Sequence, residues 1–113
     1  MTAYADINID ISADFRVEVQ VEDVENNRVN ISDVLFEAAL KRQHTDDVPT
    51  KFDVSIIDAN AGLFEISLNS IKTKNLVPGA TYVWDVFGNY LDGTRERIIE
   101  GTAKAVPSVS VLE

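Results

Sequence analysis

The sequence predicts an all-β domain, an antiparallel β-sandwich of about seven or eight short strands. Three observations favour this fold class. Apolar and polar residues alternate along most of the chain, turn-forming residues recur roughly every ten positions, and no long stretch has clear helical spacing. A chain of 113 residues matches one domain of ordinary size, about 100–150 residues. We therefore interpret residues 1–113 as a single domain.

The first two strands are predicted at residues 5–12 and 14–22. A strand places every second side chain on one face, whereas a helix would scatter these apolar residues around its circumference. We expect both segments to be half-buried antiparallel strands with one solvated side. The apolar positions are Ile7, Ile9 and Ile11 in the first segment and Phe15, Val17, Val19 and Val21 in the second.

Alternation also predicts strands at residues 52–56, 64–68, 81–87, 95–100 and 102–106. The segment from Asp58 to Gly62 is typical of a hairpin connection, because glycine accepts a positive φ angle. Residues 76–79 (LVPG) and the Asp92-Gly93 pair indicate two further turns.

Residues 32–43 (SDVLFEAALKRQ) fit two structures. The segment contains good helix formers, and Ser32 is a possible helix N-cap. It also reads as a strand with Phe36, Ala38 and Leu40 on one side. We favour the strand because β signals surround the segment on both sides.

The net charge is −9, from 19 acidic and 10 basic residues, and there is no cysteine. An acidic surface repels phosphate groups, so neither nucleic acid nor an anionic membrane is an expected partner. The sequence has no 18-residue apolar run, and its start, MTAYADINIDIS, lacks a signal-peptide pattern. We expect no signal peptide and no membrane-spanning segment.

No pattern of catalytic residues is visible, so we expect no enzyme activity, no cofactor and no catalytic metal. His44 is the only histidine, and the sequence has no serine or cysteine motif whose nucleophile it could activate as a base. The loop that starts at Asp58 departs from the calcium-loop pattern, because Leu63 and Asn69 stand at its sixth and twelfth positions. The acidic group at residues 22–25 leaves a calcium site open.

The strand around Trp84 offers two interpretations. Tyr82, Trp84 and Tyr90 would form an aromatic platform for carbohydrate if they faced solvent. The alternative is that Trp84 fills the core, as a tryptophan does in many sandwiches, and this is the interpretation we favour. Asp85 lies on the other face of the same strand, where Arg95 or Arg97 is expected to pair with it.

The order of motifs resembles a small Ig-like β-sandwich domain of tailed-phage and prophage proteins, found in the amino-terminal part of certain baseplate upper proteins. The resemblance covers about Phe15 to Val109. The family starts near the second strand, so residues 1–13 form an extra amino-terminal strand and residues 107–113 a tail. The matching residues are Asp58, Gly62 and Phe64; Leu76, Gly79, Tyr82 and Asp85; Asp92-Gly93; and Glu100-Gly101-Thr102 with Pro107.

The resemblance implies a virion structural protein of the tail, baseplate or particle surface, assembled in the host cytoplasm with other virion proteins or with itself. It transfers no catalytic residue. The candidate assembly contacts are the alternating terminal segments, with side chains Ile7, Ile9, Ile11, Val109 and Val111. The alternative function is an Ig-like module that recognises carbohydrate or a cell-surface partner through Tyr82, Trp84, Tyr90 and the loop at His44.

Overall fold

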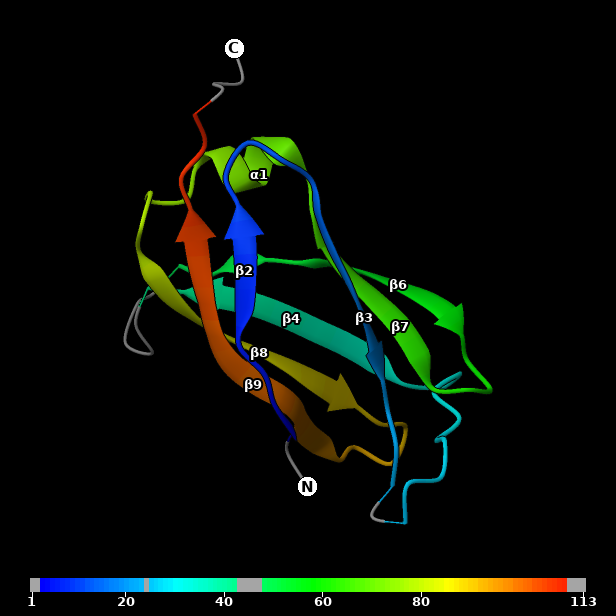
Figure 1. Cartoon of the computed structure of the whole chain (residues 1–113). Helices are drawn as coiled ribbons and strands as arrows, with labels where there is room; N and C mark the ends of the chain where they lie inside the picture. Colours follow the sequence, from blue (N-terminus) through cyan, green and yellow to red (C-terminus); the bar gives the residue numbers. More distant parts are fainter. Residues whose placement is uncertain (1–2, 24, 43–47, 110–113) are drawn as a thin grey trace.

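The chain folds into two packed β-sheets, as seen in a computed structural model that describes residues 3–23, 25–42 and 48–109 (Figure 1). The larger sheet has the order β1-β9-β8-β4-β5, with β2 also paired to β9, and the smaller sheet has the order β3-β7-β6. The strands are β1 (Ala3–Tyr4), β2 (Ile7–Asp10), β3 (Phe15–Gln20), β4 (Leu35–Lys41), β5 (Thr50–Lys51), β6 (Asp53–Asp58), β7 (Leu63–Leu68), β8 (Thr81–Asn89) and β9 (Arg95–Val106).

This strand order is that of an Ig-like sandwich. In that fold the strands B, E and D form one sheet and the strands C, F and G form the other. Here β3, β7 and β6 correspond to B, E and D, while β4, β8 and β9 correspond to C, F and G. The predicted fold class is therefore confirmed.

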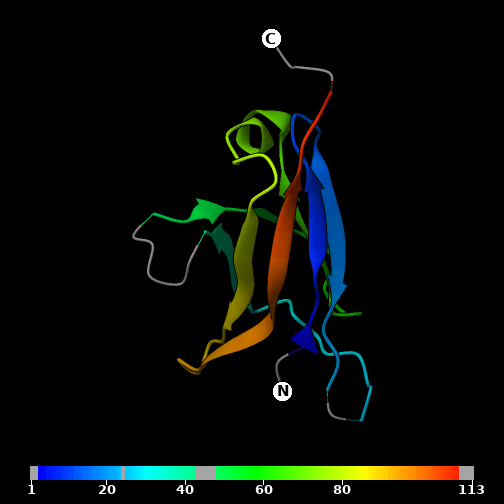
Figure 2. The same cartoon turned by 60° about the vertical axis from the view of Figure 1, so that its left-hand side comes forward.

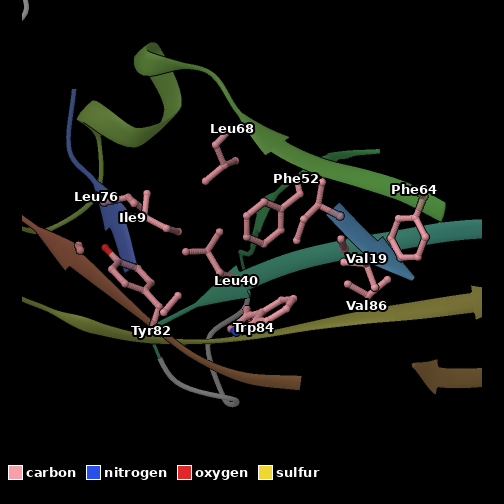
Figure 3. Close-up of a cluster of buried hydrophobic side chains, with 14 of the residues drawn as sticks. Ile9, Val19, Leu40, Phe52, Phe64, Leu68, Leu76, Tyr82, Trp84 and Val86 are labelled. Atoms are coloured by element: carbon pink, nitrogen blue, oxygen red, sulfur yellow. The ribbon is translucent and has the colours of Figure 1, made fainter. Parts of the chain in front are cut away.

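The core lies between the two sheets and is built by the alternating residues of facing strands (Figure 3). The ring of Phe52 meets that of Trp84 edge to face at a centroid distance of 6.3 Å, and Phe36 stacks on Phe64 at 4.2 Å. Such aromatic pairs add about 0.5–1.5 kcal/mol beyond the area they bury. The predicted alternation is confirmed most clearly in β7, where Phe64, Ile66 and Leu68 are fully buried.

The ambiguous segment 32–43 forms the strand β4 (Leu35–Lys41), so the strand prediction is confirmed over the described part of the segment and the helix alternative is wrong. Ala38 and Leu40 face the core, and tertiary burial outweighs the helix propensity of this run. The strands predicted at 95–100 and 102–106 are one strand, β9, with a register shift opposite Val86 and Phe87.

The prediction of antiparallel pairing is confirmed for β3 and wrong for β2. Strand β3 pairs antiparallel with β7, but β2 pairs parallel with β9 (Figure 2). The chain reverses at Ser12, which has a φ of 72°, and crosses to the other sheet. Because β2 and β3 lie in different sheets, they do not form a hairpin, and β2 instead extends the edge of β9.

A short helix, α1 (Ser70–Lys74), joins β7 to β8 and was not predicted. The side chain of Asn69 caps it by accepting a hydrogen bond from the Lys72 backbone N–H at 2.9 Å. Thr73 is fully buried and donates its hydroxyl to the Ala13 carbonyl at 2.9 Å, which ties the helix to the turn after β2. In the described part of the chain, no helix has the length and apolar character needed to span a bilayer.

Candidate interaction face

The amino-terminal residues proposed as assembly contacts belong to the domain's own core. Ile9 is 0% exposed and Ile11 is 8% exposed, while Ile7 is partly buried against the same cluster. The backbone of this segment is already paired with β9. Ile9 and Ile11 therefore cannot offer their side chains to a partner in this fold. Val109 is fully exposed, and Val111 lies outside the described residues.

The aromatic platform is not formed, because Tyr82 and Trp84 are only 6% and 3% exposed. The Tyr82 hydroxyl accepts a hydrogen bond from the Val77 N–H at 2.8 Å. This tyrosine corner is typical of Ig-like domains, where it fixes the connection into strand F. The Trp84 indole N–H donates to the Ala5 carbonyl at 3.1 Å. Tyr90 is half-buried, and burial raises the pKa of its hydroxyl.

We call the solvent side of the larger sheet the front face, and it is the candidate interaction surface of the domain. It consists of the outward residues of β1, β2, β4, β5, β8 and β9, which alternate with core residues. Leu35, at the start of β4, is exposed on this face, and Val83 and Phe87 of β8 are partly buried. The face therefore combines apolar patches with charged groups, as protein interfaces do.

Phe87 is the centre of an arginine cluster on this face. The guanidinium carbons of Arg95 and Arg97 lie 4.2 Å and 5.0 Å from the centre of its ring. Both arginines stand on β9 beside β8, and the register pairs Phe87 with Arg97. An aromatic ring this close to two guanidinium groups is attracted to both through its quadrupole.

Each arginine is also held by acidic neighbours. Arg95 forms a 2.7 Å ion pair with Glu37 of β4, and Asn89 bridges the two side chains with bonds of 2.8 Å to Glu37 and 2.9 Å from Arg95. The hydrogen bond from Arg95 lowers the pKa of Glu37. Arg97 lies 3.7 Å from Asp85, so the predicted pairing of Asp85 with Arg95 or Arg97 is confirmed for Arg97.

A shallow hollow of about 240 Å³ opens on the front face between β4, β8 and β9. Ala39 leaves the space because its side chain is small, and Lys41 and Asp85 provide charged groups at the rim. The remaining lining residues are Val83, Trp84 and Arg97. Within the described ranges no ion pair joins Lys41 to another residue, so the hollow offers a cation to a visiting group.

At the β9 edge of the sheet, the front face is flanked by the amino-terminal strands β1 and β2. Asp6 accepts hydrogen bonds from the Thr102 hydroxyl at 2.7 Å and the Thr102 N–H at 3.2 Å, and these bonds lower the pKa of its carboxyl. Tyr4 lies beside them and is 65% exposed, and a hydrogen bond to Asp6 raises its pKa.

Charge is distributed unevenly over the chain. The described residues include all 10 bases and 16 of the 19 acids, and five of each kind stand on the front face, which leaves 11 acids and five bases on the other described residues. The front face is therefore neutral, whereas the other described residues have six more acids than bases, from 11 acids and five bases. These residues are Lys41, Lys51, Arg95, Arg97 and Lys104 against Asp6, Asp10, Glu37, Asp85 and Glu100.

In the acidic group at residues 22–25, the described residue Glu25 lies in a turn. Asp23 accepts hydrogen bonds from the backbone N–H groups of Glu25 and Asn27 at 2.9 Å and 3.0 Å, and these bonds lower its pKa. Over the described ranges no group of three or more His, Asp or Glu side chains is placed to hold a metal ion. His44 lies outside the described residues.

Comparison with known proteins identifies no family. No family model and no curated protein matches the chain. Solved structures with similar strand arrangements include an internalin-like protein of Listeria monocytogenes (14% identity, TM-score 0.47, 95% of this chain and 28% of that one) and murine CRIg (9%, 0.46, 91% and 92%). A sialyltransferase of Photobacterium sp. is also similar (14%, 0.38, 94% of this chain and 18% of that one).

This chain therefore spans about a quarter of the internalin-like protein and less than a fifth of the sialyltransferase. At such identities, with every TM-score below 0.5, these neighbours carry no information on what this chain binds.

Proposed function

We propose that this chain is a non-catalytic structural module that acts through protein–protein contacts made by its front face, as a component of a tailed-phage particle. The observation that carries the binding role is the arginine cluster around Phe87 on a face that is neutral in an otherwise acidic domain. The phage context comes from the sequence resemblance described above, which implies a virion protein assembled in the host cytoplasm.

The composition of the front face supports a protein partner. Arginine and aromatic residues are enriched in the energetically important part of protein interfaces, where surrounding contacts exclude water. Phe87, Arg95 and Arg97 supply this combination on adjacent strands, so strand pairing fixes their spacing. A site on paired strands is more rigid than one on loops, which lowers the conformational entropy lost on binding.

The described carboxyl groups give little support to catalysis, and the buried aromatic rings give little support to sugar binding. The lowered pKa values of Asp6, Asp23 and Glu37 are accounted for by hydrogen bonds to neighbouring groups, which keep these carboxyls ionised. A general acid or base needs a pKa close to the working pH. Carbohydrate binding through Tyr82 and Trp84 would require both rings at the surface, whereas both are buried.

Site-specific photo-crosslinking tests the proposal. A photoreactive residue is placed at Val83 on the front face and, as the matched control, at Ser67 on the outer side of β7. The chains are expressed in a host that produces the particle, and purified particles are analysed by mass spectrometry. We expect the chain in the particles, with crosslinks to a protein from Val83 and none from Ser67. Absence from the particles refutes the phage role, and crosslinks from Ser67 alone refute the front face as the contact.

A further inference from the structure

We propose that the partner of the front face is a second copy of this chain, docked front to front about a two-fold axis that runs along β8. This inference rests on the proposed function and specifies the partner. The charge distribution favours it: the front face holds five acids and five bases, while the other described residues hold 11 acids and five bases. Two copies of an acidic protein repel one another least when their neutral faces meet.

The register of the sheet determines which groups would meet. At the level of Phe87, β4 presents Glu37 on one side of β8 and β9 presents Arg97 on the other. A two-fold rotation about an axis along β8 brings the β4 side of one copy over the β9 side of the other. Glu37 of each copy then faces Arg97 of its mate, and the same ion pair forms twice, as an isologous interface requires.

In the same two-fold dimer, a side chain of the second copy would enter the hollow. At the level of Asp85, β4 presents Ala39 and β9 presents Glu100. The rotation therefore places the Glu100 side chain of one copy above Ala39 of the other, where the hollow of about 240 Å³ opens. Lys41 at its rim has no ion pair with another residue of the described ranges, and it would pair with the incoming carboxylate.

The residues of β8 itself would lie on the axis and meet their own copies. Val83 against Val83 and Phe87 against Phe87 give apolar contacts along the centre of the interface. Asp85 stands between them and would meet a second Asp85, which is a repulsive contact. A variant at Asp85 is therefore a specific test of this arrangement. Neutralising Asp85 should strengthen the dimer, whereas a general disruption of the face would weaken it.

The size of the face predicts a weak dimer. The nine residues of β8 extend over about 30 Å, and four adjacent strands span about 19 Å. The flat footprint is therefore about 600 Å² per copy, below the roughly 800 Å² that each partner of a standard interface buries. We expect a dissociation constant between about 10 µM and 1 mM, which suits repeated contacts in a symmetric particle.

A charge-swap experiment by sedimentation velocity tests the proposal. Glu37→Arg should place arginine against arginine, and Arg97→Glu should place glutamate against glutamate, so each variant alone should dimerise about tenfold more weakly. An equal mixture should form a heterodimer with an affinity close to that of the unchanged chain, since both pairs become complementary. Glu65→Arg on the outer side of β7 changes the net charge as Glu37→Arg does and should leave dimerisation within about twofold.

Asp85→Asn provides a measurement that does not depend on how well Arg97→Glu folds, and it should tighten the dimer about threefold. A chain that stays monomeric up to about 1 mM overturns the proposal, and so does an Asp85→Asn variant that dimerises less well. If the chain is monomeric but Val83 still crosslinks to another particle protein, the second-copy inference fails and the proposed function stands. If crosslinking at Val83 also fails, both fail.

Discussion

At Gly101 a single added methyl group should strongly destabilise the domain, because there is no space for it. A Cβ atom added there would lie 1.7 Å from the Ala5 carbonyl oxygen and 3.1 Å from the Trp84 indole nitrogen. The clash is with the backbone of Ala5, which lies in the link between β1 and β2, so Ala5 can avoid it only by moving away from β9 by more than an ångström. Gly101→Ala therefore tests how the amino-terminal segment is attached to the domain.

The loss of stability in Gly101→Ala follows from the contacts that the displacement of Ala5 breaks. Ala5 donates its N–H to the Glu100 carbonyl at 2.9 Å and accepts the Trp84 indole N–H at 3.1 Å. Each hydrogen bond contributes about 0.5–1.5 kcal/mol net. Displacement also loosens the packing of β2, whose residue Ile9 is fully buried. We expect Gly101→Ala to lower the free energy of unfolding by about 2–4 kcal/mol.

The assay is urea denaturation combined with hydrogen exchange, and Gly93→Ala is the matched control. Gly93 has a φ of 90° with no atom within 4 Å of an added Cβ, so its replacement should cost only about 1 kcal/mol of backbone strain. In Gly101→Ala the amide of Ile11, which donates to Val106 at 3.0 Å, should exchange faster. A loss no larger than that of Gly93→Ala, or unchanged exchange at Ile11, would refute the reasoning.

Three further outcomes are expected. Ile9→Ala should lower the free energy of unfolding by about 2–4 kcal/mol in urea titrations, because Ile9 is fully buried. An unchanged free energy of unfolding would mean that Ile9 lies at the surface and is again a candidate assembly contact. Glu65→Arg should raise that energy by about 0.5 kcal/mol, because Glu65 and Glu18 are cross-strand neighbours of like charge, and a decrease would contradict this. Asp6 has a lowered pKa in the folded chain, so Asp6→Asn should reduce the melting temperature at pH 7. The difference in melting temperature should fade as the pH falls below 3.8, the ordinary pKa of the carboxyl, and through the lowered pKa. A difference that does not change with pH would exclude the Thr102 bonds as its cause.

Much of the fold could be predicted because the period-2 pattern is local. Along β7 and β8 the alternation alone identifies which residues are buried, and Trp84 and Phe64 are placed correctly by it. The hairpin turn at Gly62 was also predictable, since its φ of 71° favours glycine. These features depend only on neighbours in the sequence.

The features that were missed depend on which strands meet. Ile9 looks the same in sequence whether it packs on the domain's own core or on a neighbour, and only the parallel pairing of β2 with β9 decides between them. The residues Glu37, Phe87 and Arg95 come from three different strands, so no spacing in the sequence predicts that they form a cluster. The cap of α1 at Asn69 was a usable signal, but five residues are too few for a helical period to stand out.

The core and the front face are linked through β8. In Ig-like antibody domains the strand-F tyrosine is followed two residues later by a cysteine that is bonded to the opposite sheet. In this cysteine-free chain that position is Trp84, which fills the core and donates its indole N–H to the Ala5 carbonyl in the link between β1 and β2. Because side chains alternate along a strand, the contacts that fix Tyr82 and Trp84 inside also fix Val83 and Asp85 outside.

Any substitution that shifts β8 should therefore disturb the register of the front face along with the stability of the domain. Trp84→Phe removes the indole N–H while retaining an aromatic ring, so it should lower stability and weaken front-face association together. Tyr82→Phe removes only the bond to Val77 at the end of the strand, so it should lower stability by about 1–2 kcal/mol and leave association unchanged. Equal effects of the two variants on association would argue against this coupling.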